Sequence, residues 1–259
     1  MSTMMRCTLF LLLGLLPVLA QKAPGPTNVL VLVADDLGWN GVSYHNPRMT
    51  TPALAKLAKE GVQLERFYGY PVCSPARAAL LTGMMPRRFG VVDVIGPGQQ
   101  GIPQGTATLA STLQKAGYTT SLIGKWHLGT NPGPLGHGFD HFYGFTGAEL
   151  DYFKHVDQRG KPDWWRDGQP IEEAGYTTTL FADEAIKQLK RRDPRKPFFL
   201  EVAVNAPHAT LAAPQELLDR APALVGNEPG TESVLDQVAV ADGDAVRLGD
   251  VQLTFSATE

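Results

Sequence analysis

Apolar and polar residues alternate along the chain in blocks that predict strands and helices in turn. Residues 28–34 are a continuous apolar run after Asn28, which is typical of a strand buried on both faces. Residues 118–123 and 198–204 are the second and third predicted strands. Residues 51–60 and 178–190 instead repeat apolar side chains at helical spacing, and residues 108–116 do the same before a glycine. These three segments are therefore predicted to be amphipathic helices.

This order of elements predicts an α/β fold with a doubly wound, mostly parallel sheet flanked by helices. Open sheets of this kind bind ligands beyond the carboxyl ends of their strands. Polar residues follow all three predicted strands: Asp35 and Asp36, Lys125 and His127, and His208. We expect these side chains to gather at one edge of the sheet, with Lys125 and His127 facing the same side if the strand continues through them.

The stretch from residue 148 to residue 170 shows no clear period and is expected to form a loop over that edge. Its aromatic and imidazole side chains are Tyr152, Phe153, His155, Trp164 and Trp165. They either pack the loop against the sheet or form a wall for an apolar or sugar ring. Packing is the favoured interpretation, because no spacing supports the other.

The composition indicates a globular protein, since 43% of the 259 residues are hydrophobic. A formal net charge of -3 gives no broad basic field, so nucleic acid is not an expected partner. Residues 1–20 contain Arg6, an apolar run over 9–16 and a small-residue end at Ala20, which predicts a cleaved signal peptide and a secreted or periplasmic protein. That run is too short for a stable transmembrane helix, and no membrane span is expected.

Cys73 lies where a loop is predicted to become a helix. Pro75 suits a first helical turn, and the good helix formers that follow it end at Gly83. Arg77 is four residues after Cys73, so it lies on the same helix face and adds to the positive end of the dipole, where an anion would be held. Because Cys7 leaves with the signal peptide, Cys73 would be the one cysteine of the mature chain. The alternative for such a cysteine is a small buried apolar side chain.

Two motifs resemble one known family. Residues 71–83 read Cys-x-Pro-x-Arg and then Leu-Leu-Thr-Gly, which is similar to the sulfatase signature. Residues 117–127, Gly-Tyr-Thr-Thr-Ser-Leu-Ile-Gly-Lys-Trp-His, match the second signature of that family. The resemblance covers residues 28–214 and is closest to arylsulfatases and the N-acetylgalactosamine 6-sulfatase group. It implies a sulfuric ester hydrolase that cleaves sulfated carbohydrates or aryl sulfates.

The resemblance also implies how the centre is built. A formylglycine-generating enzyme would oxidise Cys73, and the hydrated aldehyde would attack sulfur as the nucleophile. Asp35, Asp36 and the modified Cys73 would bind Ca²⁺, with Mg²⁺ as the alternative. Calcium suits two carboxylates better than zinc because no thiolate or histidine pair is expected at metal spacing. Without the family context, adjacent aspartates at a strand end are more often a solvated turn.

The remaining roles fall to four basic side chains. Arg77 would fix the hydrate, and Lys125 would hold both the sulfate and the hydrate. His127 would orient or deprotonate the second hydroxyl of the hydrate. His208 would bind sulfate and assist the leaving oxygen, although a loop histidine bonded to the backbone is a competing interpretation.

The chain departs from the family pattern towards its C-terminus. Sulfatases complete the metal cage with an Asp-Asn pair, which this sequence lacks, and Asp242-Gly243-Asp244 is a weak substitute. We therefore expect a signal peptide over 1–20, the N-terminal part of a sulfatase-like catalytic domain over 27–214, and an atypical tail over 215–259 with a hairpin at 246–253. Two alternatives stay open: an inactive truncated remnant without the C-terminal metal ligands, and a promiscuous phosphonate or phosphate ester hydrolase of the same superfamily.

Overall fold

The computed structural model describes residues 25–220, 247–248, 251–252 and 256–257. The predicted signal peptide and Asp242-Gly243-Asp244 lie outside the described residues. Within them, no helix has the length and apolar character needed to cross a bilayer. The elements in chain order are β1 (Val29–Ala34), η1 (Trp39–Gly41), α1 (Pro52–Glu60), α2 (Cys73–Thr82), η2 (Pro86–Phe89), α3 (Leu109–Lys115), β2 (Thr119–Lys125), η3 (Leu135–His137), β3 (His141–Phe145), β4 (Trp165–Arg166), β5 (Gln169–Pro170), α4 (Thr177–Arg191), β6 (Phe198–Val204), α5 (Gln215–Arg220), β7 (Arg247–Leu248), β8 (Val251–Gln252) and β9 (Ser256–Ala257).

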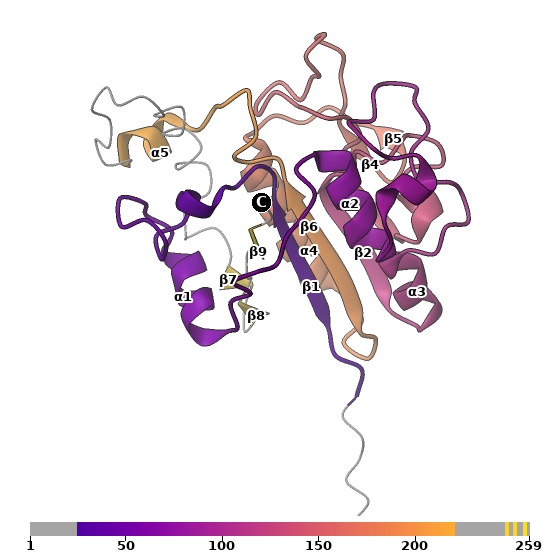
Figure 1. The fold of residues 1–259 in the computed structure, drawn as a ribbon, viewed down its shortest axis with the longest axis horizontal. Coiled ribbons are helices and arrows are strands. Elements are labelled where there is room, and N and C mark those ends of the chain that lie inside the picture. Colours follow the sequence, from indigo (N-terminus) through magenta and orange to yellow (C-terminus); the bar gives the residue numbers. More distant parts are fainter. Residues whose placement is uncertain (1–24, 221–246, 249–250, 253–255, 258–259) are drawn as a thin grey trace, which may run out of the picture.

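The main sheet has the strand order β5-β4-β3-β2-β6-β1-β9 (Figure 1). Strands β3, β2, β6 and β1 run parallel, and only the β4 and β5 pairings are antiparallel. Strand β6 lies between β1 and β2, so the carboxyl ends of the three predicted strands are neighbours at one edge. The predicted mostly parallel α/β fold is confirmed.

Two features of the sheet were not predicted. Strand β3 is built from aromatic residues around Gly144, which is why it lacks the aliphatic run that marked the other parallel strands. Strands β4 and β5 have two residues each, too few to show any period, and they lie inside the stretch expected to be a loop. They extend the sheet beyond β3 by antiparallel pairing.

Helices cover both faces of the sheet, as a doubly wound fold requires (Figure 1). On one face, Phe181 and Ala185 of α4 pack against Leu200 and Val202 of β6. On the other, Ala78 and Leu81 of α2 belong to the same cluster as Phe199 and Ala203 of β6, together with Ala110 of α3. Alternate β6 side chains thus point to opposite faces, which leaves Glu201 on the face covered by α2.

Helix α2 begins and ends where its sequence indicates. Val72 is the extended residue before the helix, so Cys73 occupies its first position. Gly83 ends it in the left-handed conformation with φ 64°, and its N–H donates to the carbonyl oxygen of Ala79. These boundaries place the Cys73 side chain at the positive end of the helix dipole.

The tail is described in part. Arg247 pairs with Gln252 and Leu248 with Val251 in an antiparallel ladder, as expected for a hairpin over 246–253. Its turn residues, Gly249 and Asp250, lie outside the described residues. Ser256 and Ala257 form β9, which pairs in parallel with Val33 and Ala34 of β1.

Candidate active site

Asp35 is the central residue at the carboxyl edge of the sheet. It follows β1 directly, and its N–H donates to the carbonyl oxygen of Ala206 after β6, at 3.2 Å. Lys125 Nζ lies 2.5 Å from Asp35 Oδ2, and Arg77 Nη2 lies 3.4 Å from Oδ1. Burial alone would raise the pKa of Asp35, but the charges of Arg77 and Lys125 outweigh it and lower that pKa. The carboxylate is therefore ionised and flanked by two cations.

Arg77 connects this carboxylate to helix α2 and strand β2. It is 5% exposed, and its Nη1 donates to the carbonyl oxygen of Lys125 at 2.8 Å. Its Nε is buried and has no partner among the described residues. The guanidinium thus contacts the Asp35 carboxylate and the Lys125 carbonyl oxygen. Its predicted place on the same face of helix α2 as Cys73 allows both contacts.

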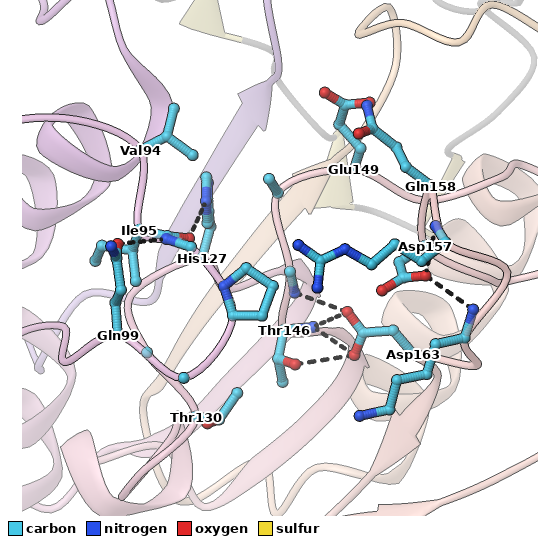
Figure 2. A pocket seen from close by; sticks show the side chains of 18 of the residues that line it. Val94, Ile95, Gln99, His127, Thr130, Thr146, Glu149, Asp157, Gln158 and Asp163 are labelled. Carbon is cyan, nitrogen blue, oxygen red and sulfur yellow. Dashed lines mark hydrogen bonds between the residues drawn. The ribbon is translucent and has the colours of Figure 1, made fainter.

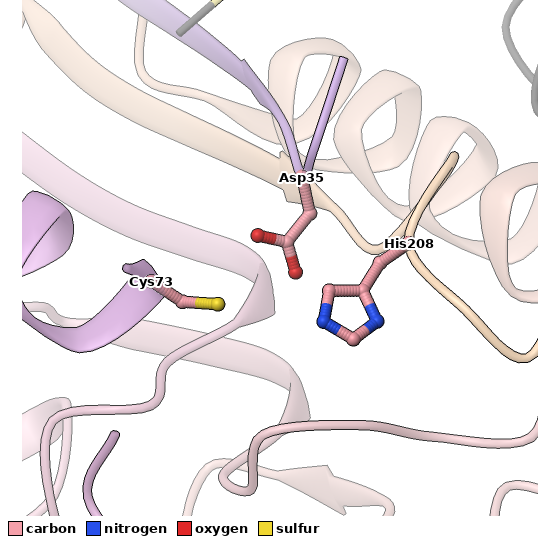
Figure 3. Close-up of side chains that lie close together, drawn as sticks. All are labelled: Asp35, Cys73 and His208. Atoms are coloured by element: carbon pink, nitrogen blue, oxygen red, sulfur yellow. The ribbon is translucent and has the colours of Figure 1, made fainter. Parts of the chain in front are cut away.

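Cys73, Asp35 and His208 point toward one another (Figure 3), and one potential ligand atom from each lies within 4.8 Å of the other two. Burial would raise the pKa of the Cys73 thiol, but the hydrogen bond with His208 and the charge of Lys125 lower it. The same hydrogen bond to Cys73 raises the pKa of His208 to about 9. The expectation that no thiolate and histidine would meet at metal spacing is wrong, because the loop after β6 brings His208 onto the start of α2.

Asp36 is oriented differently from Asp35. Its backbone has φ 63°, in the left-handed region, and its side chain is 62% exposed. Its Oδ2 lies 3.5 Å from His208 Nε2. The chain turns at this residue, so Asp35 faces Arg77 and Lys125 while Asp36 borders the centre from the solvent side. The metal-binding role of both aspartates stays a prediction.

His127 does not follow the strand geometry that would place it on the same side as Lys125. Strand β2 ends at Lys125, and His127 has φ 54°. The ring is 1% exposed, its Nε2 is 3.2 Å from the carbonyl oxygen of Ile95, and its Nδ1 is buried without a partner among the described residues. Burial, followed by the charges of Lys125 and Arg77, lowers the pKa of His127 to about 3. His127 is therefore a neutral imidazole near pH 7.

A cavity of about 390 Å³ lies next to His127 (Figure 2). Its wall includes residues 146–149 after β3 and residues 157–163 of the stretch that lacked a period. Asp163 fixes these segments together, because its carboxylate accepts hydrogen bonds from the N–H and hydroxyl of Thr146 and from the N–H of Gly147 at 2.7–3.1 Å. Asp163 was not predicted, because no local pattern indicates which loop its side chain contacts.

The aromatic residues of that stretch mostly pack, as favoured. Tyr152 and Trp164 are buried, and Trp164 stacks on His155 with ring centroids 4.2 Å apart. Phe153 is 43% exposed, and Trp165 both packs against the core and lines the cavity. Its indole N–H donates to Asp163, so the ring is held in place.

The family model described as Sulfatase matches residues 27–240. The chain belongs to the sulfatase family. Human N-acetylgalactosamine-6-sulfatase is 36% identical over 230 residues, which cover 77% of this chain and 43% of that protein. The arylsulfatase of Klebsiella aerogenes is 30% identical over 210 residues, which cover 74% of this chain and 45% of that one. This sulfatase chain thus spans less than half the length of these curated relatives.

Solved sulfatase structures share the fold. BT4656 in complex with its substrate D-glucosamine-2-N,6-O-disulfate superposes with a TM-score of 0.67 at 30% identity, over 79% of this chain and 39% of that chain. The PsFucS1 sulfatase from Pseudoalteromonas sp. gives a TM-score of 0.70 at 28% identity, over 85% of this chain and 50% of that chain. The family match extends past residue 214, and the domain division expected there stays a prediction.

Proposed function

We propose that this chain carries the centre of a sulfuric ester hydrolase whose nucleophile is formylglycine made from Cys73. The observation that supports it most is the position of Cys73, at the first residue of α2 and beside Asp35 and His208. Arg77 and Lys125 add two buried positive charges within 3.4 Å of Asp35. Export by the signal peptide predicted over residues 1–20 belongs to the same proposal.

The carboxylates fit a hard divalent cation. Arg77 Nη2 lies 3.4 Å from Asp35 Oδ1, too far for a strong hydrogen bond, so Oδ1 is the oxygen we assign to the cation, and the exposed Asp36 carboxylate lies beside it in sequence. We propose that these two residues and the oxygens of the modified Cys73 would hold Ca²⁺, or Mg²⁺ in its place. Such an ion supplies positive charge that polarises the sulfate ester.

The other side chains of the centre have separate roles in the proposed reaction. Arg77 and Lys125 stabilise negative charge on the transferring sulfuryl group, at fixed and buried positions. His127 is neutral and keeps Nδ1 free of partners among the described residues, so it suits proton acceptance from the hydroxyl of the nucleophile. His208 lies next to Cys73, where it can bind sulfate and donate a proton to the leaving oxygen.

The cavity beside His127 is the proposed place for the rest of the ester. Its wall combines the Trp165 ring with polar groups such as Thr130 and Gln99, a mixture suited to a sugar ring. One relative is named for N-acetylgalactosamine 6-sulfate, and another was solved with a disulfated glucosamine. These names support a sulfated carbohydrate as substrate, and the arylsulfatase relative keeps an aryl sulfate as the alternative.

The decisive experiment measures both the modification of Cys73 and the turnover of the substrate. The chain is coexpressed with a formylglycine-generating enzyme, and mass spectrometry of the peptide containing Cys73 measures its conversion. Converted protein with Ca²⁺ is then assayed on a sulfated hexosamine, an aryl sulfate and a phosphonate ester, with Cys73→Ala as the control. We expect sulfate release that Cys73→Ala abolishes. Full conversion without sulfate release would favour the inactive remnant, and faster phosphonate cleavage would favour the promiscuous hydrolase.

A further inference from the structure

We propose that the unoxidised chain binds Zn²⁺ through the thiolate of Cys73, the carboxylate of Asp35 and the imidazole of His208. This site belongs to the thiol form of the protein and does not depend on sulfatase activity. It differs in chemistry from the oxygen site proposed for Ca²⁺, because sulfur and nitrogen supply two of its three ligands.

The three ligands come from separate parts of the fold. Cys73 starts helix α2, Asp35 follows β1 and His208 follows β6, yet one ligand atom of each lies within 4.8 Å of the others (Figure 3). Tetrahedral zinc with bonds of about 2.0–2.3 Å places its ligand atoms roughly 3.5 Å apart. Rotations of the half-buried Cys73 and His208 side chains that move their atoms by about 1 Å would therefore close the site. A fourth position would stay open to water.

The histidine presents the correct nitrogen for coordination. His208 Nδ1 lies 2.6 Å from the carbonyl oxygen of Ala209, which fixes the N–H on Nδ1 in the neutral ring. Figure 3 shows the ring with one nitrogen toward Cys73 and Asp35 and the other turned away. Nε2 then carries the lone pair that a metal needs. A ligating histidine whose second nitrogen donates to a backbone carbonyl is the usual arrangement around protein-bound zinc.

Asp35 can join the site although two cations already contact it. Lys125 Nζ lies 2.5 Å from Oδ2, whereas Arg77 Nη2 lies 3.4 Å from Oδ1, too far for a strong hydrogen bond, so Oδ1 is the oxygen that zinc would take. The two positive charges weaken binding of any cation. The thiolate offsets this for zinc, since soft sulfur ligands favour Zn²⁺ over Ca²⁺. We therefore expect a site that is weaker than a structural zinc finger and selective against calcium.

Oxidation of Cys73 would remove the site, because formylglycine has no sulfur. Zinc binding would thus mark chains that have escaped modification, and it would shield the thiol from disulfide exchange while the ion is bound. Coordination needs no redox partner: the protons carried by the Cys73 sulfur and by His208 Nε2 are released to solvent as the sulfur–zinc and nitrogen–zinc bonds form.

The test uses the chain with Cys7→Ser, expressed without a formylglycine-generating enzyme and shown by mass spectrometry to keep the Cys73 thiol. Zn²⁺ affinity is measured by competition with a chromophoric chelator, and Co²⁺ is added to detect thiolate-to-cobalt charge transfer in the near-ultraviolet spectrum. We expect one Zn²⁺ per chain, not displaced by a large excess of Ca²⁺. A further Cys73→Ser change should abolish the charge-transfer band and weaken Zn²⁺ binding at least tenfold.

Two histidine variants separate the site from surface binding. His208→Gln should weaken Zn²⁺ binding at least tenfold, whereas His45→Gln, at a histidine stacked on Trp39, should leave it unchanged within twofold. Circular dichroism shows whether each variant is folded. Zn²⁺ binding that survives both Cys73→Ser and His208→Gln, or a cobalt spectrum without the sulfur band, would overturn the proposal. Neither readout involves turnover, so failure of the sulfatase proposal would leave this result unaffected.

Discussion

Glu201 provides a stringent test of the electrostatics of this fold. It lies in the middle of β6, is 2% exposed, and its Oε2 has no partner among the described residues. Burial raises the pKa of Glu201 to about 7 from an ordinary 4.5, and the charge of Arg77 opposes that rise only in part. The carboxyl is therefore mostly protonated below pH 7 in the folded state.

The direction and size of the pH effect on stability follow from the ordinary and the folded-state pKa of Glu201. Because the folded-state pKa is higher than the unfolded one, its contribution to stability is fully present below pH 4.5 and is lost as pH rises to about 7. Each pKa unit is worth about 1.4 kcal/mol, so a rise of about 2.5 units corresponds to a loss of about 3 kcal/mol. Glu201→Gln keeps the shape of the neutral side chain and removes the titration. We expect the variant to be more stable than the parent chain by about 1 kcal/mol at pH 5 and by about 3 kcal/mol at pH 8.

The measurement is the free energy of unfolding in urea at four pH values between 5 and 8. His127 and His208 titrate in both proteins, so the difference between parent and variant isolates Glu201. Glu172→Gln, at an exposed carboxylate, is the control and should show no pH-dependent difference. A Glu201→Gln variant that is less stable than the parent at pH 8 would refute the argument. It would mean that Glu201 is ionised and favourably paired with Arg77.

Three further changes probe the groups that build the site. Lys125→Met leaves the buried Asp35 with Arg77 as its remaining ion pair among the described residues and should cost about 3–5 kcal/mol in urea unfolding; a loss below about 1 kcal/mol would contradict a buried pair. Gly124→Ala should prevent soluble folding, because φ is 110° and a Cβ would lie 2.0 Å from the carbonyl oxygen of Ala203, whereas Gly98→Ala, with φ 76° and open space, should cost about 1 kcal/mol. Thr108→Ala removes the capping box at α3 and should lower stability by about 1 kcal/mol in a thermal melt, with unchanged stability counting against the cap.

The sequence predicted the parts of the fold whose signal is local. Aliphatic runs identified β1, β2 and β6, and a proline near the start with a glycine at the end bounded α2. Strand β3 was not predicted, because aromatic residues around a glycine do not form such a run. The mostly parallel order then placed Asp35, Lys125 and His208 at one edge, because parallel strands end on the same side.

The details of the site depended on contacts that no local pattern contains. Asp36 turns toward solvent through a single left-handed φ, and Lys125 and His127 diverge because β2 ends between them. The approach of His208 to Cys73 joins residues far apart in the chain, through a loop whose path the pairing of β1 with β6 determines. The preference for calcium over zinc assumed that this approach would not occur.

The charges of the centre bear on which ester it would bind. In the thiol form, the hydrogen bond between Cys73 and His208 lowers the pKa of Cys73 against the effect of burial and raises the pKa of His208. Conversion to formylglycine removes the sulfur, and with it the main cause of the raised His208 pKa. Arg77 and Lys125 then face the single charge of Asp35, leaving one uncompensated positive charge among these three buried groups. The Ca²⁺ proposed for this centre adds two positive charges and the Asp36 carboxylate adds one negative charge, so the metal-loaded centre keeps a positive excess. This excess favours anionic esters over neutral ones, for sulfate, phosphonate and phosphate esters alike.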